Sequence, residues 1–153
     1  MTDVLSPVAG RVVALAEVPD AVFAGQLVGA GVALEPSAPP AGSSLVEVVS
    51  PVDGVVVKLH PHAFVVVAAS GEGVLVHVGI DTVKLGGAGF TLAVAEGATV
   101  AAGDLVVSVD PAVVAQAGYS LACPVVVLDS APDSVPQESV GSDLEARSPL
   151  FEF

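Results

Sequence analysis

Hydrophobic residues in this chain occur in short runs that are separated by glycine, proline and aspartate. Valine dominates these runs, and its β-branched side chain favours strands over helices. Many short strands with glycine and proline turns between them predict an all-β sandwich or a partly closed barrel. The predicted strands include Leu45–Val49, Val74–Ile80, Leu105–Val109 and, as the last one, Val125–Leu128.

One phrase of the sequence occurs twice. The pattern Ser-Pro-Val-x-Gly-x-Val-Val-x-Leu fits both Ser6–Leu15 and Ser50–Leu59. The shared proline and glycine positions are harder to explain by chance than shared valines would be. We therefore predict an internal repeat, in which two related β motifs pack against each other.

A single short helix is predicted, over residues 112–117. Asp110 can cap its first turn, Pro111 suits its first position, and Gly118 suits its end. The proline-containing segment Val18–Phe23 is interpreted as a loop.

The composition changes after residue 129, because proline, serine, glutamate and aspartate then dominate. Such a segment has too few apolar side chains to offset the entropy lost on ordering. We predict one domain, residues 1–129, followed by a disordered acidic tail, residues 130–153.

The charge of the chain restricts its partners. Four basic and seventeen acidic side chains give a formal net charge of −13, which repels nucleic acid and favours basic proteins. Although 53% of the residues are hydrophobic, no run approaches the roughly 18 apolar residues of a spanning helix. The N-terminus has no basic region of a secretory signal, so the cytoplasm is the predicted compartment. Cys123, the one cysteine, is predicted to be a small buried hydrophobe.

Three histidines supply the candidate chemistry, and all lie between residues 60 and 77. Imidazole is the side chain that titrates near neutral pH, so proton, metal or phosphoryl chemistry would use it. Strand alternation places His77 on the face opposite the valines of its strand. A tight hairpin at Gly71 and Glu72 would pair His77 with Val66, which leaves His62 about 13 Å away along the strands. A joint site then requires a bulge, a bend or another strand pairing.

Four motifs follow one another along the chain: Val18–Phe23, Pro51–Gly54, His62–Phe64 and His77–Val83. Together they resemble the glucose-family enzyme IIA domain of the bacterial phosphoenolpyruvate-dependent sugar phosphotransferase system, over about residues 6–128. The resemblance implies an antiparallel β-sandwich without a cofactor. It also implies two protein partners, the histidine phosphocarrier protein and the IIB domain of a membrane sugar permease, and allows further regulatory targets.

The resemblance also implies roles for individual residues. His77 would accept the phosphoryl group from the phosphocarrier protein and pass it to a cysteine of the IIB domain. His62 would lie beside it and stabilise the phosphorylated state. Asp20, Phe23 and Asp81 would form a rim that meets the partner proteins. A neutral imidazole is a competent nucleophile toward phosphorus, and a second imidazole can donate to a phosphoryl oxygen, so the residue types suit this chemistry.

The chain departs from the family pattern at His60, where family members usually have a threonine two positions before the first histidine. His60, His62 and His77 also supply the three imidazoles of a catalytic zinc, so a zinc-dependent hydrolase is the alternative function. His62 and His77 alone could bind zinc at a partner interface. A lipoyl or biotinyl carrier is disfavoured, because neither Lys58 nor Lys84 lies in the required hairpin motif.

Overall fold

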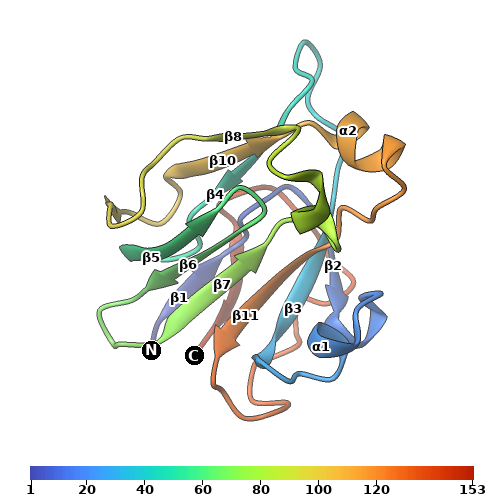
Figure 1. Ribbon diagram of the computed structural model, residues 1–153. Helices are drawn as coiled ribbons and strands as arrows, with labels where there is room; N and C mark the ends of the chain where they lie inside the picture. Colours follow the sequence, from blue (N-terminus) through green and yellow to red (C-terminus); the bar gives the residue numbers. More distant parts are fainter.

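Short strands follow one another along almost the whole chain (Figure 1). The computed structural model describes residues 1–153. The strands are β1 (Asp3–Leu5), β2 (Gly10–Ala14), β3 (Gly29–Pro36), β4 (Val46–Val49), β5 (Gly54–His60), β6 (Ala63–Val67), β7 (Gly73–His77), β8 (Phe90–Leu92), β9 (Thr99–Val100), β10 (Leu105–Val109), β11 (Cys123–Leu128), β12 (Asp143–Leu144) and β13 (Pro149–Glu152). The helices are η1 (Leu15–Glu17), α1 (Ala21–Ala24), η2 (Thr82–Leu85) and α2 (Pro111–Gln116).

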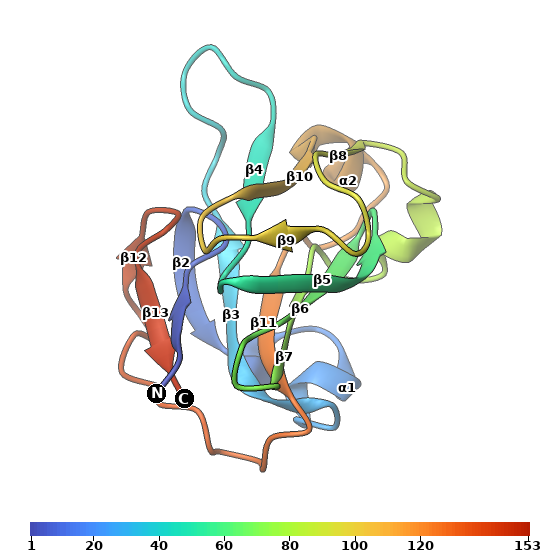
Figure 2. The ribbon, with the colours of Figure 1, turned by 90° about the vertical axis from the view of Figure 1, so that its left-hand side faces the viewer.

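The strands form three antiparallel sheets. The largest has the order β12-β2-β3-β11-β7-β6-β5-β9, and β4-β10-β8 and β1-β13 form the two smaller ones. Figure 2 shows β8 and β10 above β5 and β9, with β12 and β13 beside β2. The predicted all-β antiparallel architecture is confirmed, and no helix is long and apolar enough to cross a membrane.

Valines fill the main core. Val48 and Val107 of the three-stranded sheet pack in one cluster with Val76 and Val125 of the large sheet, and all four are fully buried. A second, smaller cluster contains Phe23 of α1 together with large-sheet residues such as Val126. The large sheet is therefore covered on both sides in this region, and α1 provides part of the second cover.

The internal repeat has a structural counterpart. Ser6 and Ser50 are both fully buried, and their hydroxyls donate to the carbonyl oxygens of Val8 and Val52, each at 2.7 Å. The two copies also bond to each other, because Leu5 N–H donates to Pro51 and Val49 N–H to Pro7. The two related motifs thus pack together as the sequence predicts.

The helix prediction is correct for α2 and incomplete elsewhere. Asp110 accepts from the Ala112 amide at 3.0 Å and Pro111 stands at the start of α2. The prediction of a single helix is wrong, however, because α1 overlaps the segment interpreted as a loop. Asp20 caps α1 by accepting from the Val22 and Phe23 amides at 2.8 and 3.4 Å. A helix this short is held by its cap and by burial of Phe23, neither of which produces a sequence periodicity.

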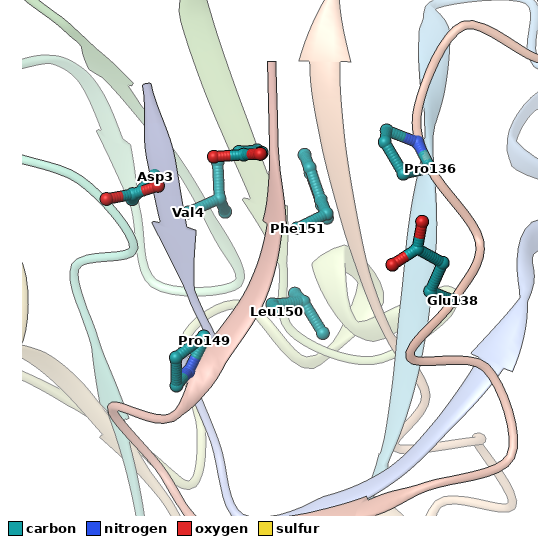
Figure 3. Close-up of a pocket in the computed structure, with 8 residues that line it drawn as sticks. Asp3, Val4, Pro136, Glu138, Pro149, Leu150 and Phe151 are labelled. Carbon is teal, nitrogen blue, oxygen red and sulfur yellow. The ribbon is translucent and has the colours of Figure 1, made fainter. Parts of the chain in front are cut away.

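The prediction of a disordered tail is also wrong. Residues after Ser130 form β12, which pairs with β2, and β13, which pairs with β1 and returns Leu150 and Phe151 to the core. Backbone hydrogen bonds to β1 and β2 stabilise this segment, and its amino-acid composition does not indicate them. A pocket of about 260 Å³ lies next to β13 and is lined by Asp3, Val4, Pro136, Glu138, Pro149, Leu150, Phe151 and Glu152. Figure 3 shows the residues that line it.

Pairing of β1 with β13 brings the two ends of the chain together (Figure 1). Thr2 and Phe153 exchange two backbone hydrogen bonds, of 2.6 and 3.0 Å. The Thr2 hydroxyl also lies 3.3 Å from that of Ser70, in the loop before β7. Both ends therefore lie near the start of β7.

Candidate functional site

His77 is the last residue of β7. Val74 and Val76 are fully buried in the main core, whereas His77 is half-buried on the opposite face, as alternation predicts. His77 pairs with Ala63 and not with Val66, so the site uses another strand pairing, which is one of the alternatives that the sequence left open. The hairpin loop spans residues 68–72 instead of a tight turn at Gly71 and Glu72, and the longer loop shifts the register toward His62.

His62 reaches His77 from a turn instead of a strand. His60 pairs with Ala63 in the β5–β6 hairpin, so Pro61 and His62 form its turn, where proline is favoured at the first position. The His62 carbonyl accepts from the Val78 amide at 2.6 Å, which ties the turn to the end of β7. The ring centroids of His62 and His77 are 5.3 Å apart, and the two rings meet edge to face. The structure thus brings together the two imidazoles that strand counting left apart.

The His77 ring is oriented by the backbone that follows it. Its Nδ1 lies 2.6 Å from the carbonyl oxygen of Gly79. A carbonyl oxygen only accepts, so the proton is on Nδ1 and the lone pair is on Nε2. The acceptor itself is fixed, because the Thr82 hydroxyl donates to Val78 at 2.7 Å and Ile80 N–H donates to Ser120 at 2.9 Å.

Gly79 is required for this arrangement. Its φ of +83° lies in the left-handed region, and a Cβ there would stand 2.5 Å from Thr82 Cγ2. The motif at 77–83 therefore builds one rigid turn whose carbonyl oxygen selects the tautomer of His77.

The three predicted rim residues surround His77 in different ways. The Phe23 ring lies 5.0 Å from that of His77, at a tilt of 57°. Asp20 acts partly within the fold, because one of its carboxylate oxygens caps α1. Asp81 is exposed and in the left-handed region, and its side chain makes no cap to η2. Val22 and Val83, on the same two elements, are 43% and 57% exposed and add an apolar surface.

Comparison with known proteins identifies the family of the chain. The family model for the phosphoenolpyruvate-dependent sugar phosphotransferase system, EIIA 1, matches residues 2–132. The chain belongs to this family. It is an EIIA component of a sugar phosphotransferase system.

Several EIIA relatives are similar over most of the chain. The glucose-specific EIIA component of Bacillus cereus is 40% identical over 129 residues, which are 83% of this chain and 74% of that protein. The glucose-specific EIICBA component of Streptococcus pneumoniae is 44% identical over 143 residues, 92% of this chain but 19% of that protein. The beta-glucoside-specific EIIBCA component of Bacillus subtilis is 42% identical over 127 residues, 82% of this chain and 20% of that protein.

A solved structure shows the same EIIA fold. Glucose permease IIA from Mycoplasma capricolum superposes with a TM-score of 0.86 at 31% identity, and covers 97% of this chain and 93% of its own. The coverage of this chain extends beyond residue 132, so it includes much of the tail that the sequence predicted to be disordered.

The surroundings of His77 and His62 favour neutral imidazoles. Burial lowers the pKa of His77, and outweighs the Gly79 hydrogen bond and the charges of Asp20 and Asp81, which raise it. Burial also lowers the pKa of His62, with smaller contributions from His77 and His60. At neutral pH both rings are therefore uncharged, and Nε2 of His77 is available as a nucleophile.

The lowered pKa of His77 predicts its titration. In the folded protein its NMR titration midpoint should lie below the value in urea-unfolded chain, which is near pH 6.5. Protons then bind the unfolded state first, so acidification from pH 6.5 down through the folded midpoint should destabilise the fold. A folded midpoint at or above the unfolded one would contradict a site governed by burial.

The geometry does not support the three-histidine zinc site. The rings of His60 and His62 stack nearly parallel, at 24° and 5.6 Å, and nowhere do three or more His, Cys, Asp or Glu side chains form a group that could hold a metal ion. Cys123 is buried, as predicted, and burial raises its pKa to about 12, so it is no thiolate ligand.

Sequence reasoning missed two contributions to this candidate site. One is the Gly79 carbonyl oxygen that orients His77, and the other is the buried Thr82 hydroxyl that holds the turn. A glycine shortly after a candidate histidine, followed by Thr82, is the available signal. Such a signal indicates a tight turn, but the acceptor of the hydrogen bond becomes visible only in three dimensions.

Proposed function

We propose that this EIIA protein carries a phosphoryl group on Nε2 of His77. The observation that carries the proposal is the hydrogen bond from Nδ1 of His77 to the Gly79 carbonyl oxygen, with the ring of His62 5.3 Å away. That bond leaves Nε2 as the nucleophile, and burial keeps the ring neutral. The family supplies the reaction type, which is phosphoryl transfer.

The donor in this proposal is the phosphohistidine of the histidine phosphocarrier protein. Nε2 of His77 attacks the phosphorus, so that a new N–P bond forms while the N–P bond of the donor breaks and its electron pair returns to the donor imidazole. The chain's net charge of −13, the exposed Asp81 and the exposed Val22 and Val83 fit a basic, partly apolar donor surface.

The acceptor is a cysteine of a IIB domain. Its thiolate attacks the phosphorus, a P–S bond forms, and the N–P bond to His77 breaks with its electrons returning to Nε2. The relatives named EIICBA and EIIBCA components support this choice, because their names combine A and B components. In this scheme a ring N–H of His62 donates to a phosphoryl oxygen.

The test is phosphorylation of the purified protein by phosphoenolpyruvate, enzyme I and the phosphocarrier protein. Intact mass should increase by one phosphate per chain, and acid should remove it because the N–P bond of a phosphohistidine is acid-labile. Omission of the phosphocarrier protein is the control and should prevent labelling. No gain in mass, or an acid-stable phosphate, would refute the proposal.

Two further parts of the proposal follow from the relatives and the sequence. The names of several relatives make glucose the first sugar to test when a permease is supplied. A cytoplasmic location stays a prediction from the sequence.

A further inference from the structure

A third imidazole, that of His60, belongs to the same cluster of rings. Its ring lies 5.6 Å from that of His62, with 24° between their planes, which is a stacked arrangement. His62 in turn meets His77 at 72°, edge to face. The three rings thus form a row in which His62 is the middle member.

His62 has few other constraints on its ring. Its position in a two-residue turn frees it from the alternation that fixes side chains in strands. The bond from Val78 N–H to its carbonyl oxygen fixes the backbone and leaves the side-chain torsions free. Neither ring nitrogen of His62 hydrogen-bonds within the chain, whereas His77 has Gly79. Contact with its neighbouring rings is therefore what orients it.

The backbone beneath His60 is itself held in place. The Glu96 carboxylate accepts from the amide of Leu59 at 3.1 Å, next to His60 in β5. His60 is the last residue of β5 and pairs with Ala63 across the turn. Its exposed ring is thus carried by a fixed strand end and offers a flat surface to His62.

We infer that His60 is a positioning residue for phosphoryl transfer. Its ring supports one face of His62 and thereby keeps His62 in its edge-to-face arrangement with His77. This role rests on the proposed function, since it matters only if a phosphoryl group occupies Nε2 of His77. A flat aromatic side chain at position 60 is the requirement, and a ring nitrogen there is not.

Three substitutions test whether the flat ring at position 60 is needed, as opposed to the volume or the charge of its side chain. His60→Ala removes the ring, His60→Leu restores apolar volume without a flat face, and His60→Phe restores the flat face without a titratable nitrogen. The first two should slow phosphoryl transfer to the IIB domain about fivefold to tenfold, the range of one lost aromatic contact. His60→Phe should stay within about twofold of wild type, and the KM for the phosphocarrier protein should not change in any of them.

NMR of the unphosphorylated proteins provides a second measurement. The chemical shifts of the His62 ring protons should change when position 60 loses its aromatic ring current, as in His60→Ala and His60→Leu. Their nuclear Overhauser contacts to His77 should weaken in those two variants and persist in His60→Phe. Thermal unfolding of each variant checks that the fold is intact.

The outcomes are distinguishable. Wild-type transfer rates in His60→Ala, or a rate in His60→Phe as low as in His60→Ala, would overturn the inference and leave the proposed function intact. Unchanged His62 contacts in His60→Ala would also overturn it. A wild-type chain that takes up no phosphate would refute the proposed function, and this role of His60 with it.

Discussion

Replacement of His77 by alanine is expected to abolish phosphoryl acceptance. The variant removes Nε2 of His77. The hydrogen bond from Nδ1 to Gly79 leaves the free lone pair of this ring on Nε2. His62 does not replace it, because its ring projects from a turn and has no fixed acceptor that selects a tautomer. Intact-mass measurement after incubation with the donor system should show less than about 1% of the wild-type phosphate label. The reason is that acceptance depends on a single nucleophile, which the variant lacks.

Loss of fold must be separated from loss of the nucleophile in this experiment. The ring of His77 packs against Phe23, so His77→Ala also removes an aromatic contact worth roughly 1 kcal/mol. His77→Gln retains bulk and a polar end without an imidazole, and should be equally inactive while unfolding at a temperature close to wild type. A stoichiometric, acid-labile phosphate on either variant would place the carrier nitrogen elsewhere.

Replacement of His62 by alanine is expected to have a different effect, on delivery and not on acceptance. The nucleophile remains, so the chain should still gain phosphate. The developing charge on the phosphoryl oxygens loses a donor from a partly buried site, and transfer to the IIB cysteine should slow about 100-fold. Rapid-quench single-turnover transfer from the isolated phosphorylated variant would measure this rate directly.

His62→Gln is the matched control for that measurement. Its side-chain amide keeps an N–H donor at a similar reach, so part of the lost rate should return. Transfer at the wild-type rate in His62→Ala would show that the second imidazole takes no part, despite its 5.3 Å separation from His77. Failure to accept any phosphate would make His62 necessary for the first step instead.

Strand alternation correctly predicted the orientation of His77, and turn geometry explains why it could not place His62. Buried Val74 and Val76 set which face His77 occupies, and that pattern is local. The distance to His62 depends on the length of the loop at 68–72 and on a turn at Pro61 and His62. A shift of a few residues in a loop is invisible to periodicity, yet it decides whether two side chains meet. The resemblance to the IIA family supplied that information instead.

The two errors in the fold have a similar cause. The helix α1 rests on one capping carboxylate and one buried ring, and the tail rests on pairing with β1 and β2. Each depends on partners far away in sequence or on a single local contact. Composition and hydrophobic pattern average over such features, so a short capped helix was interpreted as a loop and a paired strand as disorder.

The meeting of the two chain ends has a consequence for how the protein could be tethered. Thr2 and Phe153 lie near Ser70, in the loop before β7, whereas His77 is at the far end of that strand, about 13 Å from its start at strand spacing. A linker attached at either end would leave from the same pole of the molecule. The opposite pole, with the histidines, would then stay accessible to the donor and acceptor proteins of the proposed transfer.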